Sequence, residues 1–280
     1  MASVSKPFST TTHFRVSHMH WHFTFSHSQR VQSLINLNTM SSTEHTIISP
    51  AILYWGTPVV LVTSENEDGT SNISPISSAW WLGHSCVLGF NSSSKTTENM
   101  LRTNECVLNL ASDNMAEYVN KLAYTTGTNP VPESKKSRDY EFVKDKWTRT
   151  GLHPQPSSFV APPRIAECPV QMECQVVQCN GLRKDLPDRE GLIVAIEVRV
   201  LRVHVLQSLR MEGYPNRVDP DKWRPLIMSF QEFYGLGGGK VATSELGRIN
   251  EEKYRGLTKS DIIKLPGDDD DKIVAVNGGV

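Results

Sequence analysis

Short runs of apolar and β-branched residues, separated by polar turns, recur along the middle of the chain. Residues 57–63 form one such run, and turn-forming residues follow at 66–69, which predicts a strand whose hairpin partner starts at Thr70. The apolar run 86–90 and the segment 105–110 are each short enough for one buried strand. The first half of the chain therefore predicts a fold built from short β-strands.

Two segments of the second half alternate between apolar and polar residues. From position 170 to 176 the apolar side chains alternate with Gln171, Glu173 and Gln175, which is typical of a half-buried antiparallel strand. A second alternation starts at Ile196, but its phase reverses near Val200. Because successive side chains of a strand point to opposite faces, a reversal inside a strand predicts a β-bulge.

Helical spacing occurs only in short segments. Met100 and Leu101 are the apolar positions of a short helix expected between the two buried strands. Residues 114–124 place apolar side chains at spacings of three and four, which predicts a second helix. Residues 217–226 predict a turn and a short helix capped by Asp219. The expected fold class is therefore mainly β with short helices (α+β).

Residues 125–163 are polar, rich in proline and without clear periodicity. Long irregular segments inside a compact domain usually have a function or are mobile. We expect Phe142 and Trp147 to anchor this one. The glycine-rich residues 235–240 do not make a P-loop, because Val241 stands where that motif requires Ser or Thr, and a flexible loop is the better interpretation.

The two ends of the chain differ from its middle. Residues 1–38 contain no Asp or Glu and are rich in Ser, Thr and His. We expect residues 1–39 to be a disordered tail, a targeting segment or a gene-model artefact. Residues 40–240 are expected to form one domain, and residues 241–280 a C-terminal extension whose acidic end is disordered.

Composition narrows the class of protein. The chain has 280 residues and a net charge of -1, so no basic excess indicates a nucleic-acid partner. No apolar run reaches the ~20 residues that a membrane helix needs. The five cysteines form no C-x-x-C pair, which favours buried free thiols in a reducing compartment over a disulfide framework or a metal site. We expect a cytoplasmic protein, or a mitochondrial one if the N-terminal segment is a transit peptide.

The hydroxyl-rich segment 92–97, with Lys95 inside it, lies between a buried strand and the first short helix. The first N–H groups of a helix lack internal partners and the helix dipole favours negative charge, so this turn suits a phosphate group. Ser and Thr are also preferred as ordinary N-cap residues, and on the hydroxyls alone a simple cap is the more common case. The residues by themselves leave both interpretations open.

Two blocks of sequence resemble the flavin reductase-like, FMN-binding split-barrel family. The first is SNISPIS at residues 71–77, followed by SSSKTTENM and ECVLNL, which is similar to an N-x-x-P-x-S turn, a hydroxyl-rich segment with T-x-x-N, and a strand. The second lies within residues 154–174 and is similar to a P-P-R-V-A-E-S-P-V motif, with Arg164 and Glu167 at its charged positions. The similarity covers roughly residues 50–234.

This resemblance implies a six-stranded antiparallel split β-barrel with Greek-key connections, which works as a homodimer and binds FMN near the dimer interface. It also implies NADH or NADPH as the reductant. In such an enzyme the flavin carries the hydride chemistry, which agrees with the lack of an obvious protein nucleophile, triad or metal cluster in the sequence. The positions that match the motifs imply these cofactor contacts: Asn72, Ser74, Ser77, Ser78, Asn91, Ser93, Ser94, Thr96 and Asn99.

The sequence departs from the family pattern first near the expected flavin pocket and then near the expected substrate pocket. Trp80 and Trp81 replace smaller residues, and an Arg-x-Gly-Gly segment usual in the family is absent at positions 228–231. No catalytic residue is assigned, and His204, on the polar phase of its strand, is more simply a solvated or structural residue. Weaker candidates for substrate contact are Trp80, His204, Arg224 and Tyr234.

Three functions are compatible with these observations. The first is an FMN-dependent NAD(P)H oxidoreductase that passes hydride to a flavin or another small-molecule acceptor. The second is a non-catalytic flavin- or haem-binding split-barrel module, and the third is a phosphate-binding interaction domain without a redox role. Arg164 and Glu167 are expected to pair with each other or to order the long irregular segment. No metal, nucleic acid or membrane partner is expected.

Overall fold

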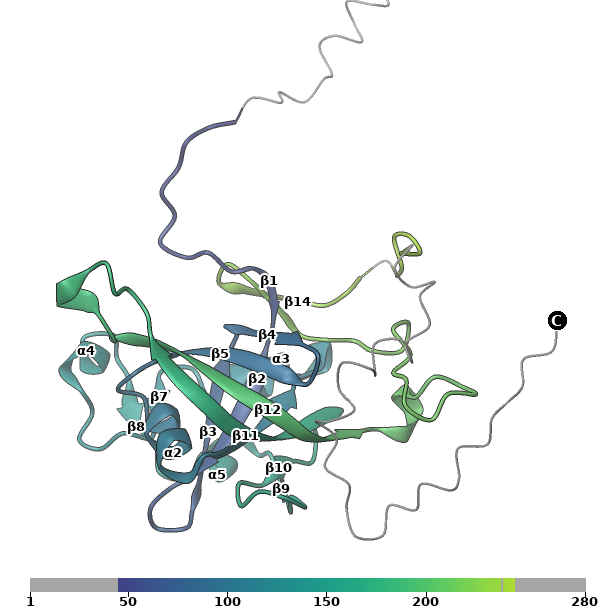
Figure 1. The fold of residues 1–280 in the computed structure, drawn as a ribbon, viewed down its shortest axis with the longest axis horizontal. Coiled ribbons are helices and arrows are strands. Elements are labelled where there is room, and N and C mark those ends of the chain that lie inside the picture. The colour runs from purple at the N-terminus through teal and green to yellow at the C-terminus, as the bar shows by residue number, and fades with distance from the viewer. Residues whose placement is uncertain (1–44, 238, 245–280) are drawn as a thin grey trace, which may run out of the picture. The chain divides into compact units, whose positions relative to one another are not determined.

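The computed structural model describes residues 45–237 and 239–244, so the expectations for residues 1–39 and 245–280 lie outside the described residues. Residues 45–50 belong to a separate unit and have no regular secondary structure. The rest is built on a seven-stranded antiparallel sheet in the order β3-β2-β6-β11-β12-β5-β4 (Figure 1). Its strands are β2 (Val60–Glu65), β3 (Ser71–Ile76), β4 (Ala79–Leu82), β5 (Ser85–Asn91), β6 (Glu105–Leu110), β11 (Val170–Gly181) and β12 (Ile193–Val205).

Smaller elements surround this sheet. Three short sheets contain β1 (Trp55–Pro58) with β13 (Ile227–Ser229) and β14 (Glu232–Tyr234), β7 (Thr125–Thr126) with β8 (Glu141–Phe142), and β9 (Pro154–Gln155) with β10 (Arg164–Ile165). The helices are α2 (Lys95–Thr103), α3 (Ala116–Asn120), α4 (Glu133–Lys136) and α5 (Lys146–Thr150), with single 3-10 turns η1 (Asp113–Met115), η2 (Pro187–Arg189) and η3 (Gln207–Leu209).

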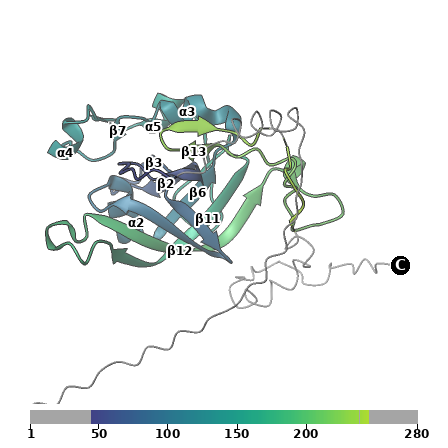
Figure 2. The same cartoon turned by 90° about the horizontal axis from the view of Figure 1, so that it is seen from above.

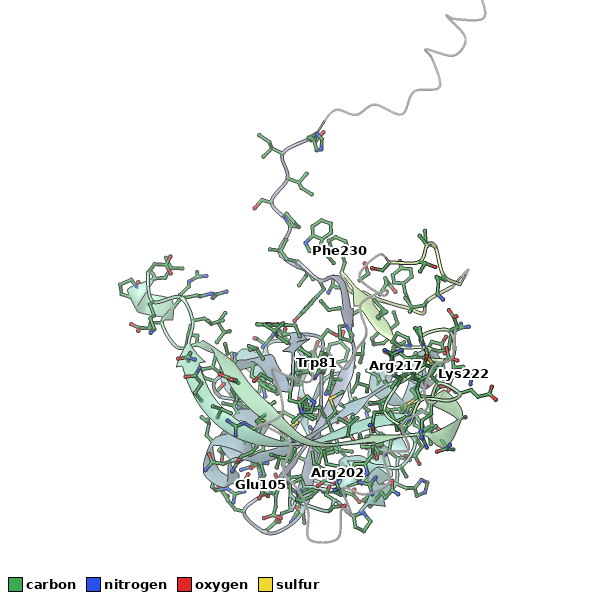
Figure 3. The ribbon with its side chains drawn as sticks, turned by 45° about the vertical axis from the view of Figure 1, so that its right-hand side comes forward. Trp81, Glu105, Arg202, Arg217, Lys222 and Phe230 are labelled. Carbon is green, nitrogen blue, oxygen red and sulfur yellow. The ribbon has the colours of Figure 1, made fainter. Side chains whose placement is uncertain are left out.

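The inner faces of the curled sheet share one apolar core. Val60, Leu88, Leu108 and Ile196 come from four different strands and are fully buried in it, together with Met100 from α2. The indole of Trp81 packs against the same core from β4 (Figure 3). The apolar phase of each strand therefore faces inward, as the alternation along the sequence requires.

A second apolar cluster covers the outer face of β2 and β3. Leu61 and Ile73 from these strands pack with Met115 of η1, Val119 of α3 and Ile165 of β10. Figure 2 shows α3, α5 and β13 on this side of β2 and β3. Because β2 is covered on both faces, its sequence is a continuous apolar run rather than an alternation.

Most strands occur where the sequence predicts them. The hairpin of β2 and β3 is confirmed, and its turn is closed by the Asn66 N–H donating to Thr70 O (2.7 Å). Strands β5 and β6 match the two predicted buried strands. The prediction for α2 is half right, because Met100 is buried whereas Leu101 is 46% exposed.

The bulge near Val200 is also confirmed. Cys174 on β11 pairs with Val200 and Glu173 pairs with Arg202, so Leu201 is the extra residue on β12. The prediction of a half-buried β11 is wrong at its start, because Gln171 and Glu173 are buried as well. The polar face of this strand is covered by residues 153–168, which local periodicity does not reveal.

Three other expectations need correction. The sheet has seven strands rather than six, and its two edge strands, β3 and β4, are not paired with each other among the described residues. No helix forms between residues 217 and 226, although Asp219 does accept a hydrogen bond from the Asp221 N–H (3.0 Å) in a turn. Phe142 is exposed, so Trp147 anchors the long segment, donating to Ser71 Oγ (2.9 Å).

The cysteines follow their prediction: Cys86, Cys106, Cys168 and Cys174 are buried free thiols, and Cys179 is partly buried. Within the described ranges, the helices are too short or too polar to cross a membrane.

Candidate functional site

The turn before α2 is a closed cap. Asn91 Oδ1 accepts hydrogen bonds from the Ser93 N–H (3.0 Å) and the Ser93 hydroxyl (2.7 Å). Ser94 is the N-cap, and its hydroxyl oxygen accepts from the Thr97 N–H (3.1 Å). The Thr97 hydroxyl in turn donates to Asn91 O (3.0 Å). These side chains fix the start of α2, where the first backbone N–H groups have no acceptor within the helix.

The other predicted residues of α2 lie on its buried face. Thr96 is 1% exposed, and its hydroxyl oxygen accepts from Asn72 Nδ2 on β3 (3.0 Å). Asn99 is fully buried, and its Nδ2 donates to Ser64 Oγ (3.1 Å) and Asn66 Oδ1 (2.8 Å). These bonds attach α2 to the β2–β3 hairpin, so in this structure Thr96 and Asn99 position the turn and do not face solvent.

The irregular segment passes tightly over the same place. A Cβ added to Gly127 would lie 2.6 Å from Asn72 Oδ1 and 3.2 Å from Lys95 Cβ, so only glycine fits there. A cavity of about 360 Å³ opens beside it, and Asn72, Lys95, Gly127 and Asn129 contribute to its wall. The start of α2 thus borders a hollow that the sequence pattern does not show.

Ser77 and Ser78, in the link from β3 to β4, lie in the wall of a separate cavity of about 470 Å³. Ser78 Oγ is 2.8 Å from Tyr54 Oη, and Ser78 O accepts from the Gly89 N–H (2.7 Å). A Cβ on Gly89 would lie 2.8 Å from Ser78 Cβ, so glycine permits this close approach. Four aromatic side chains complete the wall with Tyr54: Tyr124, Tyr140, Phe230 and Phe233.

Two edge-to-face pairs involve rings of this wall, one within the wall and one between Phe230 and Trp55, which lies outside it. Tyr124 and Tyr140 have ring centroids 5.9 Å apart, and Phe230 packs on Trp55 at 4.6 Å. Such pairs hold aromatic rings in defined orientations. No motif in the sequence marks these residues, because they come from segments that lie far apart along the chain.

The sequence pattern also does not mark two lysines, Lys146 and Lys135, as part of the site. Lys146 is 3% exposed, its Nζ donates to Ile73 O (2.8 Å), and burial together with the nearby Lys135 lowers the pKa of Lys146 to about 7. Lys135 Nζ donates to Thr126 Oγ1 (2.8 Å), next to Gly127. Neither ammonium group has a carboxylate partner among the described residues. A buried positive charge of this kind favours a nearby anion.

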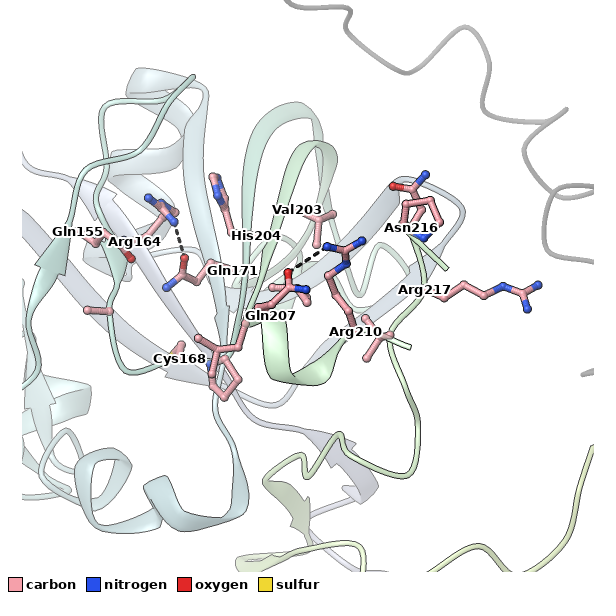
Figure 4. Close-up of a pocket in the computed structure, with 16 residues that line it drawn as sticks. Gln155, Arg164, Cys168, Gln171, Val203, His204, Gln207, Arg210, Asn216 and Arg217 are labelled. Atoms are coloured by element: carbon pink, nitrogen blue, oxygen red, sulfur yellow. Dashed lines mark hydrogen bonds between the residues drawn. The ribbon is translucent and has the colours of Figure 1, made fainter. Parts of the chain in front are cut away.

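The four weaker candidates are not gathered in one place. Trp80 is 57% exposed on the edge strand β4. Arg224 forms an ion pair with Asp113 (Nη2 to Oδ2, 2.8 Å), and Tyr234 is an exposed residue of β14. His204 lies near the end of β12 and lines a different, larger cavity (Figure 4). Ser74, between the two main groups of predicted residues, is partly exposed on β3.

Residues 54–236 match the model of the flavin reductase like domain. The chain belongs to this family. The matched residues include β3, the α2 cap, the motif around Arg164 and, apart from Ile52, every residue that lines the two cavities beside them.

Similarity to known proteins supports this family assignment. The chain is 38% identical over 200 residues to the uncharacterized protein YdfE of Bacillus subtilis (strain 168), covering 71% of this chain and 93% of YdfE. Its fold is similar to flavoredoxin of Desulfovibrio vulgaris (Miyazaki F), with 17% identity, a TM-score of 0.57, and coverage of 74% of this chain and 100% of the flavoredoxin. It is also similar to an FMN-binding protein of Thermus thermophilus, with 12% identity, a TM-score of 0.52, and coverage of 73% of this chain and 100% of that protein. The family's split-barrel architecture therefore applies to this chain.

Proposed function

We propose that this chain is an FMN-dependent oxidoreductase that takes hydride from NADH or NADPH and passes it through FMN to a small-molecule acceptor. The observation that carries the proposal is the arrangement along β5. Gly89 lies against Ser78 in the aromatic cavity, and the α2 cap starts two residues later at Asn91. From Gly89 to Ser94 the chain spans at most about 17 Å. One elongated ligand with an aromatic ring at one end and a phosphate at the other can reach both places.

The residues present fit FMN at both ends. The paired aromatic rings around Ser77 and Ser78 suit a planar ring system, and the cavity falls within the usual size range of ligand sites, about 300–1,000 Å³. At the other end, the N-terminus of α2 and the ammonium group of Lys95, in the wall of the adjoining cavity, suit a phosphate group. The similarity to an FMN-binding protein and to flavoredoxin supports the same cofactor.

In this proposal the protein binds FMN, orients it and shields it from water. Bound FMN would supply the hydride-transfer chemistry. Backbone and hydroxyl donors of Ser77 and Ser78 hold the edge of the ring and stabilise negative charge that develops there. The backbone N–H groups of Lys95 and Thr96, which the cap leaves without a side-chain acceptor, hold the phosphate, while the side chains of Asn72 and Thr96 keep that helix in place. Tyr54 and Phe230 exclude water from the ring.

We also propose a homodimer. The edge strand β4 exposes Trp80 by 57% and Leu82 by 76%. A sheet edge that exposes large apolar side chains is a surface for pairing with another chain. Sedimentation of the FMN-loaded protein should give the mass of a dimer, and a monomer at micromolar concentration would contradict this part of the proposal.

Purification tests the cofactor directly. The purified chain should be yellow or become yellow with added FMN, and denaturation should release FMN. The protein should then oxidise NADH or NADPH in steady state when free flavin or an artificial acceptor is present. A colourless protein that cannot be reconstituted with any flavin rules out the proposal. A flavin-loaded protein without NAD(P)H oxidation indicates the non-catalytic binding module instead.

A further inference from the structure

A cavity of about 740 Å³ lies between the start of β11, the end of β12 and residues 207–218 (Figure 4). Its volume is typical of small-molecule sites, which measure about 300–1,000 Å³. The wall contains Arg164, His204 and Arg210, and none of its lining residues is Asp or Glu. It shares no lining residue with the aromatic cavity. The positive lining sets it apart from an ordinary surface hollow, where charges of both signs are mixed.

Two of the three arginines in the wall, Arg164 and Arg210, lack carboxylate partners among the described residues. Arg164 donates to Pro156 O from Nε (3.1 Å) and Nη2 (2.8 Å), and to Gln171 Oε1 from Nη1 (2.8 Å). Arg210 donates from Nη1 to Gln207 Oε1 (2.9 Å), and its buried Nε has no hydrogen-bond partner. A guanidinium stays charged at any ordinary pH, so neutral partners satisfy its geometry but leave its charge uncompensated.

His204 is held in a fixed orientation at the same wall. Glu173 is fully buried and accepts from the backbone N–H groups of Ser158 (2.9 Å) and Phe159 (2.6 Å). His204 Nε2 lies 2.6 Å from Glu173 Oε1, and an ionised carboxylate only accepts, so Nε2 donates. The Glu173 carboxylate behind this wall is therefore engaged by the backbone and by His204, and the second ring nitrogen of His204 remains for a ligand.

We infer that this cavity is a binding site for a small organic anion, carrying carboxylate or phosphate groups, that is held by Arg210 and Arg164 with His204 beside them. The planar guanidinium of arginine can donate two parallel hydrogen bonds to a pair of oxygens in either group. The site lies outside the proposed flavin site and extends the proposed function without depending on it.

The test is calorimetric titration of the full chain, saturated with FMN, at constant ionic strength. Citrate serves as the carboxylate probe, pyrophosphate as the phosphate probe and glycerol as the neutral control. We expect saturable binding of at least one anion and none of glycerol, and the preferred anion identifies the chemical source. Arg210→Gln should weaken binding on the order of tenfold or more, because a hydrogen-bonded charge is lost. The matched control is Arg199→Gln, which removes the same charge from an exposed position of β12 outside the cavity and should change affinity by less than about twofold.

Three results would overturn the inference. These are no saturable binding of either anion, an equal loss in both variants, or release of FMN by the anion, which would place it in the flavin site. If Arg210→Gln does not fold, Arg210→Lys keeps the charge but loses the planar fork, and unchanged affinity in that variant also contradicts the inference. If the chain does not bind FMN, the same anion titration is done on the flavin-free protein. Failure of the proposed function can then be told apart from failure of this anion site.

Discussion

Two regions of this chain bury polar side chains in opposite ways. Beside α2 the buried groups are neutral: Asn72 donates to Thr96, and Asn99 bonds the β2–β3 hairpin. At the start of β11 the buried group is ionised, because Glu173 bonds two backbone N–H groups and His204. The first network holds a helix start in place, and the second holds a histidine at a cavity wall.

The difference lies in how each region responds to pH. Burial raises the pKa of Glu173, but bonds from the Ser158 N–H, His204 and the Phe159 N–H outweigh it, so the net shift is downward. Partial burial lowers the pKa of His204, with help from Arg164 and against the effect of Glu173. Amides and hydroxyls do not gain or lose protons at ordinary pH, so the α2 network is insensitive to acid. The ionised region therefore makes stability depend on pH.

Lys146 extends the comparison to a buried charge without a counter-ion and gives the largest expected effect. Its pKa is about 7 in the folded chain against 10.5 normally. Between these values the unfolded chain binds more protons, so the free energy of unfolding rises with pH. The rise from pH 7 to pH 10 should be on the order of 4 kcal/mol. The Lys146→Met variant should lack this rise in the free energy of unfolding. The measurement is urea unfolding of the flavin-free protein at several pH values.

The matched control is Lys144→Met. Lys144 lies two residues earlier and is exposed, with a surface ion pair to Asp68 (2.9 Å). Its loss should change stability by less than about 1 kcal/mol at any pH. A Lys146→Met profile that stays parallel to wild type would show that this ammonium does not titrate as its burial implies.

A direct comparison of the two networks gives the next largest effect. Glu173→Ala should cost about 3 kcal/mol at pH 7, because it leaves buried donors unpaired, and Asn99→Ala about 1–2 kcal/mol. The lowered pKa of Glu173 means that its contribution is complete above 4.5 and is lost as pH falls through the folded value. Unfolding at several pH values should show the Glu173→Ala deficit shrinking below 4.5 while the Asn99→Ala deficit stays constant. Two parallel profiles would contradict the assignment of Glu173 as ionised.

The same contrast explains how much the sequence could predict. Strands such as β6 follow from local apolar patterns, and so does the bulge beside Val200, because side-chain alternation is a property of neighbouring residues. The burial of Glu173 could not be predicted, since its partners Ser158 and Phe159 reach it through tertiary packing of an aperiodic segment. Leu101 was misplaced because its helix has only one buried apolar position.

The candidate site likewise contains some residues that the sequence could predict and others that it could not. Motif positions Ser77 and Ser78 do line a cavity, and Ser94 does cap α2. Tyr54 and Lys146 complete the surroundings through contacts between residues distant in sequence, and neither lies in a recognisable motif. A family motif identifies positions by spacing, whereas the roles of Thr96 and Asn99 depend on which face of α2 is covered.

Thr96 gives the smallest effect and decides between cap and cofactor. Its hydroxyl accepts from Asn72 and is 1% exposed, so Thr96→Ala should destabilise the flavin-free protein by about 1 kcal/mol. Ser93→Ala is the control, since Ser93 is exposed and bonds only Asn91 in the same turn. If the backbone of α2 holds the phosphate, FMN and riboflavin affinities should change equally and little in both variants. A loss of FMN affinity on the order of ten- to a hundredfold in Thr96→Ala, with riboflavin unaffected, would instead mean that the hydroxyl turns from Asn72 to the phosphate. The neutral network would then be part of the binding site rather than its support.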